Sequence, residues 1–200
     1  MLIPNPMPFG QQAEAFDDPA WIYELTHDGF RALLAVEQRR CRFFSGTKQK
    51  LYGYRDLREA LVREVNAQSA MLDGELVVTD AHERRGPAGV MPPGKQARYC
   101  AFDLLWLDGE DLRGRPLLSR KEKLKLILPS RSLFLFYVDH AIGSGLRLYE
   151  LACEMDLDGI VAKRADSLYD DNPNGRNWMK INNSHYGQRA GRRDQLKRAG

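Results

Sequence analysis

The sequence predicts an α+β fold built from antiparallel sheets. Short runs that are apolar, or that alternate between apolar and polar residues, recur along the chain between Asp-Gly and Pro/Gly-rich turns, a pattern typical of β-strands. A few stretches instead carry apolar residues four positions apart, which indicates amphipathic helices. Because these helices do not alternate strictly with the strands, the pattern favours an α+β arrangement over a parallel βαβ sheet.

The N-terminal part of the chain is expected to hold a meander of strands and one helix. Residues 1–20 are rich in Pro, Gln and Asp and are interpreted as an irregular lead-in segment. A helix is expected over residues 56–67, because Leu57, Leu61 and Val65 fall on one face. The strands are expected at residues 21–25, 31–36, 41–44 and 72–78.

The C-terminal part is expected to begin with a long exposed loop at residues 80–97, where three Gly and three Pro stand among charged residues. Ser119 with Glu122 matches a capping box, which predicts that a helix begins there. The remaining expected elements are strands at residues 98–107 and 134–138, a helix around residues 148–155, and strands at residues 159–163 and 177–181.

Composition narrows the class of protein. With 43% apolar and 28% charged residues, the 200-residue chain suits one globular domain. It has no run of about 18 apolar residues that would predict a membrane helix, and no basic region followed by an apolar stretch at the N-terminus. A cytoplasmic location is therefore the default expectation. The widely spaced Cys41, Cys100 and Cys153 are expected to be buried reduced thiols, since no Cys/His spacing suggests zinc.

Polar residues stand at the ends of several predicted strands. Asp-Gly pairs occur at residues 28–29, 73–74 and 158–159, and each pair alone is most simply a sharp turn. Gathered on one sheet face, however, carboxylates with lysines and an arginine would suit a phosphate-bearing, metal-bound ligand. No Walker A loop is present, so a nucleotide site would need another design.

Five segments in a fixed order carry a family resemblance, namely residues 24–31, 72–77, 101–105, 158–163 and 178–182. This series resembles the nucleotidyltransferase motifs of ATP-dependent DNA ligases, and Arg115-Pro116-Leu117 and Ser167-Leu168-Tyr169 are typical of the bacterial members. The resemblance implies an antiparallel-sheet nucleotidyltransferase (ATP-grasp-like) adenylation domain. That domain is expected at residues 21–183, after the lead-in segment and before a basic tail at residues 184–200.

The resemblance also implies roles for single residues toward ATP. Phe102 would stack on the adenine ring, and Glu75 would accept a hydrogen bond from a ribose hydroxyl. Arg31 would contact the ribose and the nick-side phosphate. Lys163 and Lys180 would hold the α-phosphate and neutralise charge in the transition state.

Two acidic residues complete the implied set. Glu24, in the first motif, is assigned to the same ATP site. Asp158 stands where the family has a glutamate that binds the metal, and Mg²⁺ is the metal that the resemblance implies. The basic tail at residues 184–200 has two interpretations. Its positive charge suits it to bind nucleic-acid phosphates, or it is simply a solvated end of the chain.

The departures from the family pattern centre on Thr26. This residue occupies the position of the lysine that attacks ATP and forms a lysyl–AMP phosphoramidate. A threonine hydroxyl is shorter and has no comparable route to activation, so self-adenylation is expected to be impaired or lost. Asp158 is one methylene shorter than glutamate, Asn182 replaces a basic residue of the last motif, and Gly46 stands where bacterial relatives usually have an arginine.

Three interpretations stay open from the sequence. The first is a ligase-like domain that binds ATP and DNA without adenylation. The second is an active ligase completed by a displaced lysine, such as Lys48 or Lys50, or by a partner chain. The third is a non-catalytic nucleotide- or DNA-binding module. Because only residues 183–200 follow the last motif, no OB-fold is expected here. The expected partners are nicked or broken DNA and an OB-fold or repair-complex chain.

Overall fold

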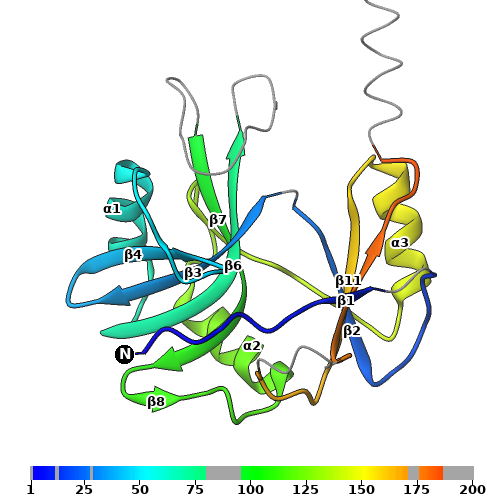
Figure 1. Ribbon diagram of the computed structural model, residues 1–200, viewed down its shortest axis with the longest axis horizontal. Coiled ribbons are helices and arrows are strands. Elements are labelled where there is room, and N and C mark those ends of the chain that lie inside the picture. The colour runs from blue at the N-terminus through cyan, green and yellow to red at the C-terminus, as the bar shows by residue number, and fades with distance from the viewer. Residues whose placement is uncertain (1, 12–13, 28, 80–95, 171–175, 187–200) are drawn as a thin grey trace, which may run out of the picture. The chain divides into compact units, whose positions relative to one another are not determined.

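Strands dominate the computed structural model, and they form two separate sheets (Figure 1). The structure describes residues 2–11, 14–27, 29–79, 96–170 and 176–186. The predicted basic tail lies almost wholly outside these residues, as do Asp28 and most of the predicted loop at residues 80–97. At the end of that loop the prediction is wrong, because residues 96–97 belong to a strand.

The chain divides into two compact units, each with one sheet. Unit 1 consists of Met1–Met7, Gly29–Asp139 and Asp166–Pro173. Unit 2 consists of Pro8–Asp28, His140–Ala165 and Asn174–Gly200.

The sheet of unit 1 has the strand order β5-β4-β3-β6-β7-β8, with β9 added beside β7. All of its pairs are antiparallel except β7 with β9, which is parallel. Its elements in chain order are β3 (Phe30–Glu37), β4 (Arg40–Ser45), β5 (Lys50–Leu51), α1 (Arg55–Glu64), β6 (Ser69–Thr79), β7 (Gln96–Leu107), β8 (Glu110–Asp111), α2 (Leu117–Ile127) and β9 (Leu135–Tyr137).

One face of this sheet forms the main core. Ala32, Leu34 and Val36 alternate along β3 and pack in one cluster with Leu57 and Leu61 of α1. This period of two on the strand, matched to a period near four on the helix, is the pattern that the sequence carried. Arg31 occupies the alternate position on β3, so it lies on the other face of the sheet.

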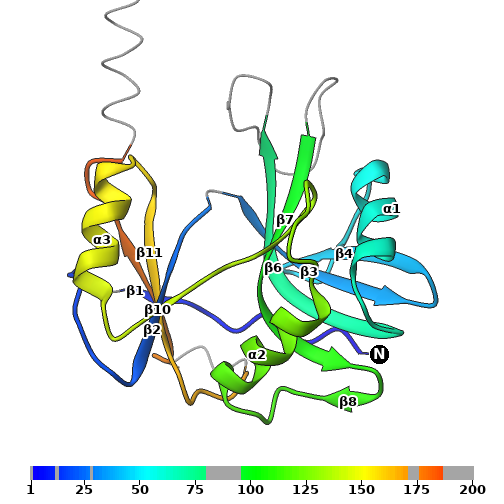
Figure 2. The same cartoon turned by 180° about the vertical axis from the view of Figure 1, so that it is seen from behind.

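The sheet of unit 2 has the strand order β1-β12-β11-β2-β10. Its pairs are antiparallel except β1 with β12. Seen from behind, α3 runs beside β11 (Figure 2). The elements are β1 (Gly10–Gln11), β2 (Trp21–Leu25), β10 (Ala141–Ile142), α3 (Gly145–Glu154), β11 (Gly159–Arg164) and β12 (Trp178–Asn182).

The longer predicted elements are confirmed, and two further local predictions are wrong. Helix α2 begins at Leu117 with Pro116 at its N-cap and no side-chain cap, so the capping box at Ser119 does not form. Proline suits the start of a helix because it needs no amide donor there. Cys41 and Cys100 are buried free thiols as predicted, whereas Cys153 on the surface of α3 is only half-buried.

Candidate functional site

Five of the predicted site residues belong to unit 2, and three of them lie on strands whose register fixes where their side chains point. Glu24, Val161 and Lys180 are cross-strand neighbours on β2, β11 and β12, so their side chains share one face. Lys163, two residues beyond Val161, lies on that same face. The opposite face is apolar and packs against α3 through Tyr23, Ile160, Ala162, Ile181 and Ala152. Unit 2 therefore has one polar sheet face.

Lys163 and Glu24 form a buried ion pair on this polar face. The distance from Nζ of Lys163 to Oε2 of Glu24 is 2.6 Å, and the two side chains are 1% and 3% exposed. The ammonium also lies 4.2 Å from the ring centre of Trp178, which is the cross-strand neighbour of Lys163. Two desolvated charges at this distance are strongly coupled, so the carboxylate fixes the position of the ammonium.

Lys180 and Asp158 form a second ion pair, which is partly exposed. Nζ of Lys180 donates to Oδ2 of Asp158 at 2.7 Å. Among the residues that the structure describes, no group of three or more His, Cys, Asp or Glu side chains is placed to hold a metal ion. The metal role that the resemblance implies for Asp158 stays a prediction.

Thr26 is buried just beyond the end of β2 and is hydrogen-bonded to Gly159 of the fourth motif, residues 158–163. Its hydroxyl donates to the carbonyl oxygen of Gly159 at 2.9 Å, and its amide donates to the same oxygen at 3.2 Å. Gly159 is required at this point, because it has a φ of +144° and an added Cβ would lie 2.1 Å from the carbonyl oxygen of Ile181. The proton of the Thr26 hydroxyl is therefore directed at a backbone acceptor.

In unit 1, a β-bulge sets the direction of Phe102. The register between β6 and β7 runs from Asp73 opposite Asp103 to Gly74 opposite Ala101, so Phe102 has no partner on β6. An extra residue of this kind re-aims a side chain. Gly74 allows the close approach at the bulge, because an added Cβ would lie 2.4 Å from the carbonyl oxygen of Cys100. Phe102 is buried, and its ring centre lies 5.7 Å from Cζ of Arg31.

Arg31 is held by a fully buried carboxylate. Its Nη2 and Nε donate to the two oxygens of Asp73 at 2.6 and 3.0 Å, and its Nη1 donates to the carbonyl oxygen of Met7. Tyr169 donates its hydroxyl to Asp73 at 2.7 Å and accepts a hydrogen bond from the Met7 amide. Burial is the largest cause that raises the pKa of the Tyr169 hydroxyl well above 10, so the hydroxyl remains a donor.

Glu75 is the cross-strand neighbour of Arg31 on the same face of the unit 1 sheet. Its Oε2 is buried and accepts no hydrogen bond from any residue that the structure describes. A buried carboxylate oxygen without a donor is unfavourable, which makes this oxygen ready to accept one from a ligand. The role toward a ribose hydroxyl, which the resemblance implies for Glu75, stays a prediction.

Helix α2 packs against the bulged strand β7 and contacts it through two buried cations, Arg120 and Lys121. Arg120 donates to both oxygens of Asp103 at 2.8 Å and to the carbonyl oxygen of Ser167 at 2.9 Å. Lys121 donates to the carbonyl oxygens of Phe102 and Val138 at 3.3 and 3.0 Å. These hydrogen bonds from α2 hold β7 in place at Phe102 and Asp103.

Sequence reasoning missed the supporting residues Asp73, Asp103, Arg120 and Tyr169. All are buried, and Tyr169 falls in a stretch that the sequence had marked only as typical of the bacterial members. The departure at Gly46 has no steric reason, because an added Cβ would meet nothing within 4 Å. Lys48 and Lys50 are exposed residues of unit 1, and Lys50 is the first residue of β5.

Comparison with solved structures defines the class of the fold. The chain is similar to mycobacterial DNA ligase D complexed with ATP and MES, with a TM-score of 0.71 and 24% identity over 89% of this chain and 60% of that one. The ligase domain of LigD from M. tuberculosis gives a TM-score of 0.72 at 23% identity, over 89% of this chain and 59% of that one. The fold is thus that of a DNA ligase adenylation domain.

The family is shown by sequence. A family model described as ATP dependent DNA ligase domain matches residues 8–182, and the chain belongs to that family. It is 29% identical over 192 residues to the SPbeta prophage-derived DNA ligase-like protein LigB of Bacillus subtilis, covering 91% of this chain and 68% of the relative. It is 28% identical over 167 residues to the multifunctional non-homologous end joining protein LigD of Pseudomonas aeruginosa, covering 80% of this chain but only 20% of that relative.

No helix in the described part of the chain is long and apolar enough to cross a membrane.

Proposed function

We propose that this chain is a DNA ligase-type adenylation domain that binds ATP but does not form the covalent lysyl–AMP adduct. The observation that carries the proposal is the Thr26 hydroxyl, which is buried and donates to the Gly159 carbonyl at 2.9 Å. A hydroxyl becomes a nucleophile when a base takes its proton, and a backbone carbonyl cannot act as that base. The side chain at this position therefore fixes the backbone between two motifs instead of attacking phosphorus.

Retained nucleotide binding is supported by the residues of unit 1. The bulge at Phe102 presents an aromatic ring, Arg31 is oriented by Asp73, and Glu75 has a buried oxygen in need of a donor. Phe102 is proposed to stack on the adenine, Arg31 to contact the ribose and a phosphate, and Glu75 to accept a hydrogen bond from a ribose hydroxyl. None of them depends on the lost lysine.

The lysines of unit 2 are proposed to take the phosphates. Lys163 and Lys180 each carry a positive charge toward the polar face, and Asp158 is the carboxylate proposed for Mg²⁺. A bound magnesium ion would offset phosphate charge at this position. The lysines themselves are proposed to hold the α-phosphate by charge-assisted hydrogen bonds once they exchange a carboxylate for a phosphate oxygen.

The proposed partner is nicked or broken DNA, and the proposed setting is DNA repair or recombination in the cytoplasm. Support comes from the names of the relatives, which include an end-joining protein, and from the family of this chain. The chain spans about two thirds of the LigB relative and a fifth of the LigD relative, so complete nick sealing is not proposed for this segment. An OB-fold or repair-complex chain is proposed to supply what sealing requires.

The test uses the purified chain with α-labelled ATP and magnesium, followed by denaturing electrophoresis. The unaltered chain is expected to give no labelled band, while calorimetry detects ATP binding that Phe102→Leu weakens. Thr26→Lys is the parallel variant, and a labelled band with it alone would show that the rest of the site is intact. A blank from this variant would instead place a further limit at Asp158, at Asn182 or at the need for the proposed OB-fold partner.

A labelled band from the unaltered chain would contradict the proposal and favour an active ligase. Mapping of the adduct would then begin with Lys48 and Lys50. If neither an adduct nor ATP binding is found, the remaining interpretation is a module that binds DNA or protein without nucleotide. Salt-sensitive DNA binding that depends on residues 189–198 would support that third interpretation.

A further inference from the structure

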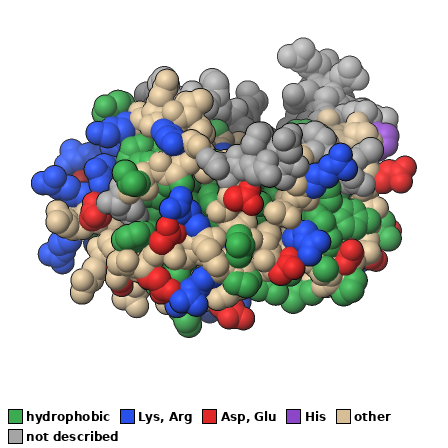
Figure 3. All heavy atoms as spheres, turned by 60° about the horizontal axis from the view of Figure 1, so that its bottom comes forward, with side chains coloured by type: hydrophobic (Ala, Val, Ile, Leu, Met, Phe, Trp, Pro, Cys, Tyr) green, Lys and Arg blue, Asp and Glu red, His purple; other side chains and the backbone are tan. Residues whose placement is uncertain are grey.

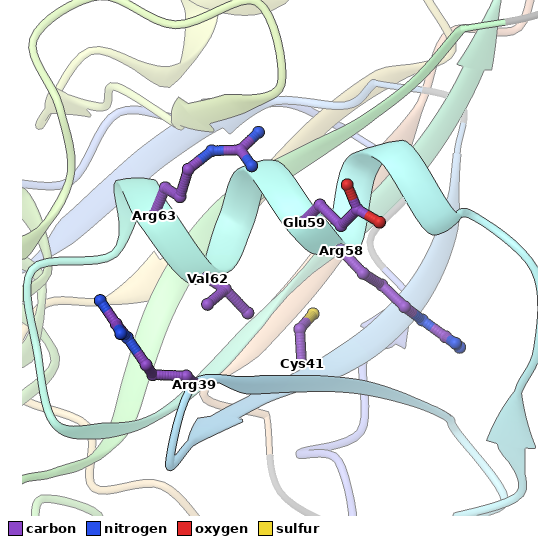
Figure 4. Close-up of a pocket in the computed structure, with 6 residues that line it drawn as sticks. All are labelled: Arg39, Cys41, Arg58, Glu59, Val62 and Arg63. Atoms are coloured by element: carbon purple, nitrogen blue, oxygen red, sulfur yellow. The ribbon is translucent and has the colours of Figure 1, made fainter.

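A pocket in unit 1 has no part in the nucleotide site proposed above. It has a volume of about 650 Å³ and lies between α1 and the turn that joins β3 to β4. The residues that line it are Arg39, Cys41, Arg58, Glu59, Val62 and Arg63, and this group is called the arginine pocket (Figure 4).

The pocket lies on the other side of the unit 1 sheet from Arg31. Helix α1 covers the face that carries Ala32, Leu34 and Val36, whereas Arg31 occupies the alternate register with Glu75 beside it. A substitution in the arginine pocket is therefore separated by the sheet from Arg31 and Glu75, the unit 1 residues on the opposite face that are assigned to the nucleotide. This separation allows the two proposals to be tested independently.

The charge of the pocket is positive and is not balanced from within. It holds three arginines and one glutamate, and Glu59 already accepts a hydrogen bond from Arg55 at 3.0 Å. In the described part of the chain, neither Arg39 nor Arg63 has an ion-pair or hydrogen-bond partner. Their guanidinium groups are thus available to an anion, and guanidinium binds phosphate through two parallel hydrogen bonds.

Arg58 contributes a second, independent observation. Its Nη2 donates to the carbonyl oxygen of Leu51, and its Cζ lies 5.9 Å from the ring centre of Phe43, so the side chain is held in place. Its Nε is buried and has no acceptor among the described residues. Arg58 therefore adds a fixed positive charge to the lining of the pocket.

The centre of the pocket is apolar. Figure 4 shows Cys41 and Val62 facing each other between the side chains of Arg39 and Arg58. Burial raises the pKa of the Cys41 thiol to about 12, which keeps it neutral at physiological pH. The thiol therefore neither repels an anion nor acts as a nucleophile, which suits a binding pocket and not a reaction centre.

The positive charge extends beyond the pocket along the β3–β4 turn. Gln38 and Arg39 both have left-handed backbone, with φ of 50° and 59°, a turn geometry that usually selects Asn and Gly. Arg40 and Arg42 follow on β4. Figure 3 shows Lys and Arg side chains gathered at the left edge of the view, where the β3–β4 turn of Figure 1 lies. An extended polyanion fits such a surface better than an isolated small anion.

We propose that the arginine pocket binds a backbone phosphate of duplex DNA, in a contact that is separate from the nucleotide residues. The proposal rests on the proposed function insofar as DNA is the partner. The contact positions the duplex on unit 1 without reading its sequence, because phosphate contacts carry no base information.

The test measures binding of the full chain to a labelled nicked duplex by fluorescence anisotropy over a series of salt concentrations, without ATP. The variant is Arg39→Gln with Arg63→Gln, two exposed side chains whose loss leaves the core untouched. At roughly 0.15 M salt we expect Kd to rise about threefold to tenfold, and the slope of log K against log salt to fall by about 1. The control, Lys123→Gln with Arg147→Gln, removes the same charge elsewhere and should change Kd and slope much less.

A second variant gives an effect of opposite sign. Glu59→Gln removes the one negative charge that lines the pocket, so it should tighten DNA binding while the arginines remain. The proposal is overturned if the unaltered chain does not bind the duplex, if the arginine variant leaves affinity and slope unchanged, or if the control variant weakens binding equally. Because ATP is absent, failure of ATP binding or adenylation does not affect these outcomes.

Discussion

The hydroxyl of Tyr169 donates a hydrogen bond of 2.7 Å to Oδ2 of Asp73, the oxygen that also accepts from Nη2 of Arg31 at 2.6 Å. A residue from the segment that follows β11 thus helps to orient an arginine on β3. The Asp73 carboxylate is fully buried, so it needs both donors to offset its desolvation. Loss of either donor should therefore also change how the other donor is held by Asp73.

Tyr169→Phe is expected to destabilise unit 1 and to loosen Arg31. The variant removes a hydrogen bond to a buried charge, which contributes about 1.5–3 kcal/mol. Urea unfolding should show that loss, and calorimetry should show weaker ATP binding. The matched control is Tyr149→Phe, which removes a hydrogen bond of 3.2 Å to the Asn182 carbonyl oxygen at an exposed position. Equal losses for the two variants would contradict the role given to Tyr169.

Among single substitutions of the two buried cations of α2, Arg120 and Lys121, Arg120→Met is expected to lower the free energy of unfolding most. It leaves the Asp103 carboxylate buried and unpaired, and breaking a buried pair in this way costs about 3–5 kcal/mol. Adding Asp103→Leu to the same chain should recover part of that loss, because the uncompensated charge is then gone. Thermal unfolding of the single and double variants measures this; a double variant that is less stable than Arg120→Met would refute the argument.

Phe102→Leu separates the roles of Phe102 in ligand binding and in packing. Because Phe102 is only 5% exposed, truncation to alanine would open a cavity and confuse the two roles. Leucine keeps most of the bulk, so the stability change should stay below about 1.5 kcal/mol. Affinity for ATP should nevertheless fall several-fold, since the aromatic face is lost. Unchanged ATP affinity would make Phe102 a core residue without a binding role.

The two buried thiols of unit 1 predict a loss of stability at high pH. Burial raises the pKa of Cys41 and of Cys100 from the ordinary 9.0 to about 12. The unfolded chain therefore releases these protons at lower pH than the folded chain. The stability that this contributes is complete below pH 9 and is lost as the pH rises toward about 12. Urea unfolding between about pH 8 and pH 10.5 measures the slope.

Cys41→Ala should reduce that pH slope, whatever it does to stability at neutral pH. Val65→Ala, at another buried position of unit 1, truncates a side chain that does not titrate and should keep the original slope. Identical slopes for both variants would show that Cys41 does not contribute.

The parts of the fold that the sequence predicted are those with a regular period. Residues 31–36 alternate and residues 57, 61 and 65 repeat every four positions, so β3 and α1 were recognisable without tertiary information. The short strands β1, β5, β8 and β10 have only two residues each and carry no period. The start of α2 was misplaced because Ser119 and Glu122 form a capping pattern that the preceding Pro116 makes unnecessary.

The site was predictable to the extent that ordered motifs carry it. Lys163, Lys180, Glu24 and Asp158 were identified singly, but the sequence did not indicate that they pair with one another, because such pairing depends on the register of three strands. The bulge that re-aims Phe102 is likewise a property of two strands together. Neither strand alone carries a local sequence pattern that indicates the bulge.

The two ion pairs of unit 2 have a consequence for any anion that approaches its polar sheet face. Glu24 and Asp158 already occupy the ammonium groups of Lys163 and Lys180 at 2.6 and 2.7 Å. An incoming phosphate must compete with a resident carboxylate for the charge of each lysine, and the carboxylate has the advantage of a high local concentration. The affinity of this face for phosphate is then set by an exchange of counter-ions, and a weakly charged ligand will fail to open the pairs.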